Sequence, residues 1–260
     1  MAGTIDVVKE GALGYLVFSQ EARLNALTSA MWRAIPEAAR ALADDPEVRV
    51  VILRGAGESA FVAGADISEF EESRRPENRE AYDHENALAY DAIAAIEKPV
   101  IAMIHGFCIG GGLAIALQAD LRYAADDARL GIPAARLGLG YAAEGLATLT
   151  ALVGPSFAKE LLFTAKRFGA REAQAMGLVN GVFPKSELES TVRALAHAIA
   201  DNAPLTLKSA KRAIDDVLRP PERRDAGAVG EAIAACYGSD DYREGVRAFL
   251  EKRAPRFQGR

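Results

Sequence analysis

The sequence predicts an α/β fold with repeated strand–helix units, followed by a helical C-terminal region. A unit of strand, helix and strand spans residues 15–53, and a similar arrangement recurs at residues 98–125. From residue 186 onward the apolar spacing is helical throughout. We therefore expect residues 1–200 to form the core and residues 201–260 to form a separate helical region.

The composition is that of an ordinary soluble protein. The chain has 260 residues, of which 50% are hydrophobic and 26% charged, and its net charge is −5 without a basic block, so we expect no nucleic-acid partner. Cys108 and Cys236 lie far apart and predict neither a disulfide framework nor a metal site. The N-terminus lacks a signal or transit pattern, and His105 and four glycines interrupt the apolar run at 100–118. We expect a cytoplasmic protein without a membrane helix.

The elements follow in order from apolar spacing and from capping and turn residues. Thr28 is expected to cap a helix that reaches about Ala43, and Pro36 inside it predicts a kink or a late start. Residues 69–85 are highly charged, and predict a mobile, solvated segment. The other predicted strands are 15–19, 48–53, 100–104, 120–125 and 179–183, and the other predicted helices are 86–96, 113–117, 146–153, 157–164, 170–176, 186–201, 204–218, 222–236 and 240–252.

The stretch 98–120 carries the first indication of a site. An apolar run typical of a buried strand ends at Gly106, and the triplet 110–112 of glycines precedes a helix. Such a turn presents unpaired N–H groups to a phosphate or to a developing oxyanion, although a tight structural turn would have the same pattern. There is no GxGxxG, and no Lys-Ser/Thr pair follows the glycines, so a dinucleotide-binding oxidoreductase is disfavoured.

A second stretch, FVAGADIS at 61–68, precedes the first, which reads KPVIAMIHGFCIGGG at 98–112. In this order and spacing the two resemble the enoyl-CoA hydratase/isomerase family, the crotonase superfamily. The resemblance extends from LNAL at 24–27 to FLEKR at 249–253. It implies an α/β spiral of ββα repeats with a C-terminal helical trimerisation region, and assembly as a homotrimer or a dimer of trimers. It implies an acyl-CoA thioester as substrate and no cofactor, because coenzyme A is part of the substrate.

The resemblance also implies site residues. The backbone N–H groups of Ala65 and Gly111 are expected to hold the thioester oxygen as it gains negative charge. Arg23, Lys252 and Asp66 have alternative interpretations, the first two as ordinary surface charges and the third as a helix cap. The residues implied in binding substrate or coenzyme A, some from a neighbouring subunit, are Arg23, Ala63, Asp66, Ile67, Gly110, Phe249 and Lys252.

Two glutamates that hydratases of the family use to activate water are replaced here. The corresponding positions are Ala114, three residues after Gly111, and Ala134, directly after Gly131-Ile132-Pro133. Because a methyl group cannot transfer a proton, we expect no efficient hydration of an enoyl-CoA. Isomerases of the family need a carboxylate near the second position, so isomerisation is disfavoured too.

Two side chains of the following segment remain as candidates for catalysis. Tyr141 follows Gly111 by thirty residues, as in the methylmalonyl-CoA decarboxylases of the family, and the segment 240–257 also resembles that subgroup. That subgroup has a histidine where this chain has Ala65. Tyr141 either orients a substrate carboxylate or is a packed tyrosine. Glu144 is either a general acid–base group or a first-turn carboxylate that interacts with the helix dipole.

Three functions therefore remain open. The first is an enzyme that forms an enolate from an acyl-CoA without the hydratase glutamates, as a decarboxylase or another lyase. The second is a hydratase or isomerase that works through Glu144. The third is a catalytically silent acyl-CoA-binding paralogue or scaffold. His105, at the end of a predicted strand, is expected to be structural.

Overall fold

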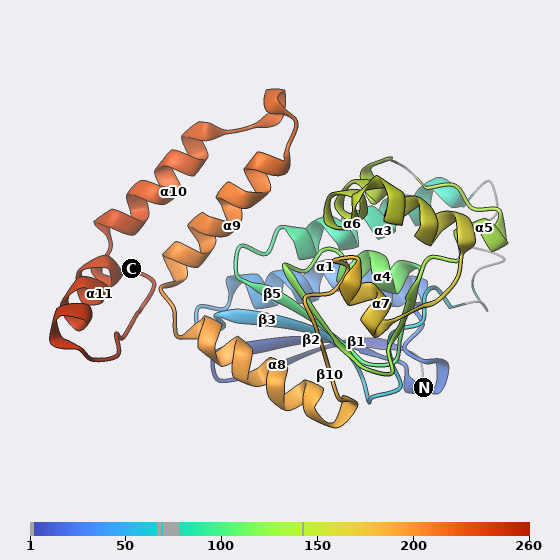
Figure 1. The fold of residues 1–260 in the computed structure, drawn as a ribbon, viewed down its shortest axis with the longest axis horizontal. Helices are drawn as coiled ribbons and strands as arrows, with labels where there is room; N and C mark the ends of the chain where they lie inside the picture. The colour runs from blue at the N-terminus through green and yellow to red at the C-terminus, as the bar shows by residue number, and fades with distance from the viewer. Residues whose placement is uncertain (1–2, 67–68, 70–77, 142) are drawn as a thin grey trace.

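The computed structural model describes residues 3–66, 69, 78–141 and 143–260, which form two sheets surrounded by helices (Figure 1). Within these residues the larger sheet consists of β1 (Thr4–Glu10), β2 (Leu13–Ser19), β3 (Val50–Gly55), β5 (Val100–Ile104), β7 (Leu121–Ala125) and β10 (Gly181–Phe183), in that spatial order. The smaller sheet consists of β4 (Ala60–Val62), β6 (Phe107–Ile109), β8 (Arg129–Gly131) and β9 (Phe168–Gly169). Neighbouring strands are parallel except in the pairs β1–β2 and β8–β9.

The two sheets are built from a repeated ββα unit. Strands β3, β5 and β7 of the larger sheet are each followed by a strand of the smaller sheet and, further along the chain, by a helix. The three units are β3–β4–α3, β5–β6–α4 and β7–β8–α5, with α3 at Arg79–Ala94, α4 at Gly111–Ala116 and α5 at Ala134–Leu137. The predicted α/β fold with a spiral of ββα repeats is confirmed.

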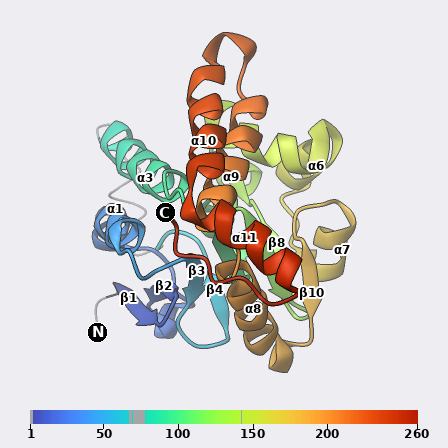
Figure 2. The ribbon, with the colours of Figure 1, turned by 90° about the vertical axis from the view of Figure 1, so that its left-hand side faces the viewer.

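Both faces of the larger sheet are covered, which explains its continuous apolar strands. On one face the side chains of alternate strand residues pack with α1 (Ser29–Asp44) and α3, and on the other face with α8 (Lys185–Ala200). Figure 2 shows the sheet between these layers. All five residues of β5 are consequently buried.

Helix α1 confirms the predicted cap and corrects the expectation about its proline. The hydroxyl of Thr28 accepts a hydrogen bond from the amide of Met31 at 3.2 Å. The helix begins directly after Thr28 and continues through Pro36, so the predicted late start is wrong. Pro36 lacks the N–H that would donate to the carbonyl of Trp32, but the side chains of Trp32 and Ile35 are buried, and this packing outweighs the loss.

The short and charged elements differ most from the prediction. Helix α3 begins at Arg79, so the end of the segment 69–85 is helical rather than solvated coil, while 67–68 and 70–77 lie outside the described residues. The segment 129–141, in which the sequence predicts no helix or strand, contains β8 and α5. Strands β6 and β9 were not predicted, because their three and two residues carry too short an apolar pattern. Strand β1 was not predicted either, although it has seven residues, because nearly all of them are exposed.

Helix α6 (Ala143–Thr164) consists of two parts. Gly154, with φ 73° and ψ 165°, interrupts it before Pro155, as the prediction of two helices at 146–153 and 157–164 requires. Among the described residues, Gly145–Thr164 is the one stretch whose length and apolar composition would suit a membrane helix. The glycine–proline interruption divides that stretch.

Beyond α7 (Ala170–Ala175) and α8, the chain ends in what we call the C-terminal arm, residues 204–260. Helices α9 (Pro204–Leu218) and α10 (Ala226–Gly238) form a hairpin that extends away from the sheets, and α11 (Asp240–Glu251) lies beside its base (Figures 1 and 2). The arm exposes large apolar side chains to solvent, namely Ile214, Val217, Leu218, Ile233, Tyr237, Tyr242, Val246, Phe249 and Leu250. One chain does not cover this surface.

Candidate active site

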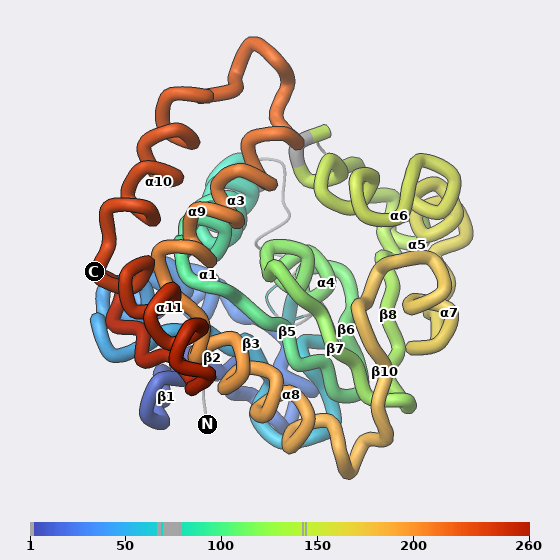
Figure 3. Tube along the Cα trace, turned by 60° about the vertical axis from the view of Figure 1, so that its left-hand side comes forward, coloured from blue at the N-terminus to red at the C-terminus, as the bar shows by residue number. Residues whose placement is uncertain are grey.

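The glycine turn between β6 and α4 lies near the centre of the molecule (Figure 3). Gly110 has φ 55° and ψ −116°, a backbone conformation that residues with a side chain rarely adopt. Its amide donates to the carbonyl of Gly131 at 2.8 Å. Gly111 then begins α4, so its amide has no partner within the helix. No described residue accepts a hydrogen bond from it.

A second unpaired amide comes from the segment after β4. The amides of Ala63 and Asp66 donate to the carbonyls of Leu24 and Leu27, at 3.0 and 2.8 Å. Ala65, between them, forms an isolated parallel bridge with Leu27. In the part of the chain that the structure describes, nothing accepts a hydrogen bond from the amide of Ala65.

Glycines allow the two segments to approach closely. Strands β4 and β6 are parallel, so the turns that follow them lie at the same edge of the smaller sheet. A Cβ on Gly112 would stand 2.3 Å from the carbonyl oxygen of Val62, and a Cβ on Gly64 would stand 3.3 Å from that of Ile109. Two backbone N–H groups that have no acceptor among the described residues thus belong to adjacent strand ends, as an oxyanion hole requires.

The two alanines that we expect to replace the hydratase glutamates belong to this same region. Ala114 lies one turn into α4 and is partly buried, and Ala134 begins α5 and is buried. The hydrogen bond between Gly110 and Gly131 joins the two segments that carry them. Neither methyl group can activate water.

The residues expected to bind coenzyme A are engaged in several ways. The guanidinium of Arg23, about half exposed, pairs with the buried carboxylate of Asp66 at 2.6 Å, and the side-chain amide of Gln20 donates to the same carboxylate at 3.0 Å. Asp66 is therefore an ion-pair partner, and the helix that it was expected to cap falls outside the described residues. Ile67 also lies outside them.

The remaining candidates lie around the start of α6 and in the C-terminal arm. Tyr141 is 39% exposed between α5 and α6. The backbone of Glu144 belongs to the first turn of α6, but its side chain lies outside what the structure describes. Phe249 is 83% exposed and Lys252 ends α11, so both belong to the C-terminal arm, away from α4 of the same chain (Figure 1).

The structure places two aromatic residues beside Gly111 that the sequence did not single out. A Cβ on Gly111 would stand 3.0 Å from Cζ2 of Trp32 and 3.9 Å from the hydroxyl oxygen of Tyr90. The two rings pack edge to face, with centroids 5.5 Å apart. One signal was available, because Trp32 is the only tryptophan of the chain and lies close after LNAL.

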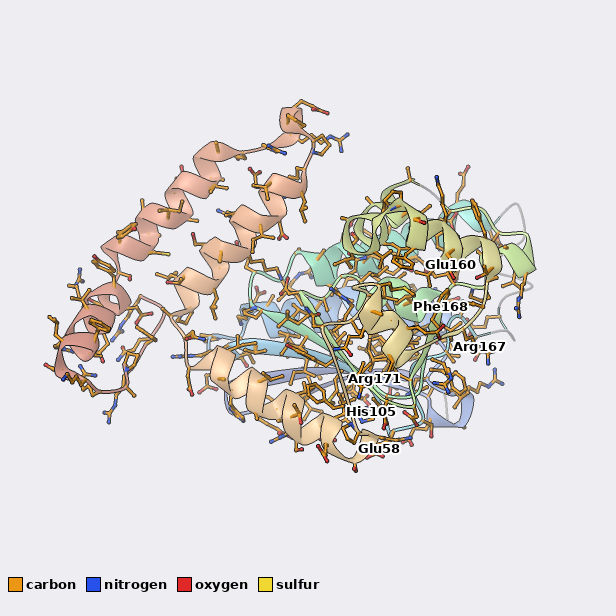
Figure 4. The ribbon with its side chains drawn as sticks, in the orientation of Figure 1. Glu58, His105, Glu160, Arg167, Phe168 and Arg171 are labelled. Carbon is orange, nitrogen blue, oxygen red and sulfur yellow. The ribbon has the colours of Figure 1, made fainter. Side chains whose placement is uncertain are left out.

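His105 and Cys108 take no part in this arrangement. His105 is 2% exposed, and its Nε2 has no hydrogen-bond partner. Burial, reinforced by the nearby Arg54, lowers the pKa of His105 below its ordinary value. Figure 4 shows His105 and Glu58 together at the end of the sheet beside α8.

Burial raises the pKa of the Cys108 thiol, which makes it unreactive. Among the described residues, no cluster of three His, Cys, Asp or Glu suits a metal ion.

Comparison with known proteins agrees with this geometry. The family model described as enoyl-CoA hydratase/isomerase matches residues 9–260. The chain is 38% identical to the short-chain-enoyl-CoA hydratase of Clostridium acetobutylicum, over 94% of each protein. It is 36% identical to the crotonyl-CoA hydratase of Syntrophomonas wolfei, over 96% of this chain and 95% of that one.

A solved structure gives the same result for the fold. The enoyl-CoA hydratase/carnithine racemase from Magnetospirillum magneticum superposes with a TM-score of 0.94 at 36% identity, covering 98% of this chain and 96% of that one. The ββα repeats, the paired glycine turns and these matches along nearly the whole chain lead to one conclusion. The protein belongs to the enoyl-CoA hydratase/isomerase family, the crotonase superfamily.

Proposed function

We propose that this protein converts an acyl-CoA thioester through an enolate held by the amides of Ala65 and Gly111. The observation that carries the proposal is the pair of unpartnered amides at adjacent strand ends. A thioester oxygen between them would gain two hydrogen bonds as its negative charge develops. Each such donor contributes roughly 3 kcal/mol to transition-state stabilisation in related acyl chemistry.

The reaction that best suits this site is loss of CO₂ from a malonyl-type thioester, or another lyase reaction. Breaking the bond to the carboxylate leaves its electron pair on the α-carbon, so the enolate forms without a base. Ala114 and Ala134 therefore present no obstacle to it. Tyr141 is the side chain proposed to orient the substrate carboxylate through its hydroxyl.

Hydration is the second candidate, because the two relatives named above are both called hydratases. In this chain it would require Glu144 to act from a new position, since the two usual carboxylates are alanines. A silent acyl-CoA-binding paralogue is the third candidate, and it predicts binding without turnover.

We further propose that the active form is a cytoplasmic homotrimer or dimer of trimers, built through the C-terminal arm. Support comes from its exposed apolar side chains and from a groove of about 770 Å³ between α9, α10 and α11. Phe249 and Lys252 would then reach the acyl group and the coenzyme A of a neighbouring subunit. Arg23, whose guanidinium is half exposed, would contact a phosphate while it remains paired with Asp66.

Mass spectrometry of acyl-CoA thioesters after incubation with the protein tests these alternatives. Loss of CO₂ from malonyl- or methylmalonyl-CoA, slowed by Tyr141→Phe, is the expected result. Rapid hydration of crotonyl-CoA that Glu144→Gln abolishes would instead establish the hydratase. Tight binding of every thioester with no conversion would establish the silent binder.

A gain-of-function variant complements this assay. Restoring both carboxylates, as Ala114→Glu with Ala134→Glu, should raise hydration of crotonyl-CoA by about 100-fold or more, since positioned acid–base groups contribute about that much. Each single variant serves as a matched control that adds charge without completing the pair. Hydration that is already fast in the unmodified protein and unaffected by the double variant would contradict the proposed loss of hydratase chemistry.

A further inference from the structure

An enolate at this site must still receive a proton on its α-carbon, and the usual carboxylates are absent. Tyr90, on α3, presents the nearest hydroxyl that the geometry identifies. Its oxygen lies 3.9 Å from the place where a Cβ on Gly111 would stand. The hydroxyl thus lies beside the backbone of Gly111, whose amide is proposed to hold the thioester oxygen.

The surroundings of Tyr90 distinguish it from its neighbour Trp32. Trp32 is 1% exposed and lies beneath Gly111, whereas Tyr90 is only partly buried, as is Gly111 itself. Tyr90 is thus more accessible than the indole of Trp32. The edge-to-face packing of the two rings, at an interplanar angle of 85°, fixes the direction of the tyrosine.

Other proton carriers near the turn are less suitable. The carboxylate of Asp66 accepts hydrogen bonds from Arg23 and Gln20, so it is engaged as an anion. His105 lies on the face of the larger sheet that α8 covers, near Lys185 and Glu189, whereas the glycine turn lies on the other side. Tyr141 is assigned to the substrate carboxylate in the proposed reaction, which leaves the proton of the α-carbon without a donor.

We propose that Tyr90 is the catalytic residue that delivers a proton to the α-carbon of the enolate, an assignment that rests on the enolate chemistry proposed above. The O–H bond of the phenol breaks as the C–H bond forms, and the electron pair of the enolate becomes that bond. The thioester carbonyl re-forms, and the phenolate recovers a proton from water. A phenol is a much stronger acid than the α-carbon of a thioester, so the transfer is downhill.

The experiment uses the reverse step, which does not require decarboxylation. Propionyl-CoA is incubated with the protein in D₂O, and deuterium at the α-carbon is measured by mass spectrometry. Tyr90→Phe keeps the ring and removes the hydroxyl, and should slow exchange by about 100-fold. Tyr123→Phe is the matched control, because Tyr123 packs on the α8 side of the sheet, and it should exchange like the unmodified protein.

The fluorescence of the chain's single tryptophan reports on the same place. An emission spectrum that Tyr90→Phe leaves unchanged shows that the packing around Trp32 is intact, so lost exchange belongs to the hydroxyl. Exchange that is equally fast in Tyr90→Phe, or absent in the unmodified protein, overturns the assignment. CO₂ release from methylmalonyl-CoA is measured in parallel: exchange without CO₂ release rejects decarboxylation and retains Tyr90.

Discussion

Strand β5 and helix α10 are both rich in apolar residues, yet their surroundings are opposite. Every residue of β5 is buried between α8 on one side and α1 and α3 on the other. Helix α10 contains no buried residue, although its sequence AGAVGEAIAACYG has only one charged residue. Apolar composition therefore has two meanings in this chain. In the core the apolar side chains are buried by the chain itself. In the C-terminal arm they remain exposed, and we propose that another subunit covers them.

The largest expected effect comes from removing apolar side chains of the C-terminal arm. Replacing Phe249 and Leu250, which are 83% and 75% exposed, by glutamate should abolish self-association while the core remains folded. Light scattering would then give a mass near 27.7 kDa. Glutamates at the exposed, charged positions Arg243 and Arg247 serve as a control for added negative charge. A monomeric unmodified protein would refute the role assigned to the arm.

Replacing a glycine by alanine should lower the free energy of unfolding in the core but not in the arm. Gly112→Ala places a methyl group against the carbonyl of Val62, and should lower the free energy of unfolding by about 1–3 kcal/mol. Gly230→Ala, in α10, meets open space and should be neutral or slightly stabilising. Urea unfolding of both variants measures the difference. Equal effects would mean that the close approach of β4 and α4 is unimportant.

Helix caps give a smaller effect of the same kind. Thr28→Ala removes the cap of α1, which packs against the sheet, and should lower the free energy of unfolding by about 1 kcal/mol. Asp225 caps α10 by accepting from Ala228 at 2.9 Å. Asp225→Ala should raise amide hydrogen exchange in α10 and leave global unfolding unchanged. A global loss from Asp225→Ala would show that the arm and the core unfold together.

The smallest expected effect is a pH dependence in the core. Burial lowers the pKa of His105 in the folded state, so below its ordinary value near 6.5 the unfolded chain binds the proton more readily. The free energy of unfolding should therefore decrease as pH falls from 7 to 5. His105→Gln should reduce this slope, whereas His197→Gln, at an exposed position of α8, should not. An unchanged slope in His105→Gln would remove His105 as its source.

The sequence predicts those elements whose pattern is long and whose ends are marked. The apolar run of β5, the cap of α1 and the helices of the arm all appear near their expected bounds. Strands β6 and β8 were not predicted, because they have three residues each and depend on pairing with one another. The charged start of α3 was predicted as coil, since its tertiary contacts are invisible in the local pattern.

The candidate site divides in the same way. The motifs predict a role for the backbone amides of Ala65 and Gly111, and among the described residues neither amide has an acceptor. They do not reveal Trp32 and Tyr90, which meet only after α1 and α3 have packed together. Apart from Trp32 being the single tryptophan of the chain, the local sequence gives no sign that these two aromatic residues lie beside Gly111. Side-chain roles at Tyr141 and Glu144 therefore stay predictions until they are measured.

The two amides that we propose as the oxyanion hole come from different ββα repeats, and this has a consequence for how the protein would become active. Each repeat supplies one amide, and the two amides come together only after β4 has paired with β6. Long-range pairing of this kind is a slow event in folding. We expect a nascent or partly folded chain to be inert toward thioesters, and turnover to return during refolding only with the final rise in Trp32 fluorescence. Chemical competence would thus be the last property that the chain acquires.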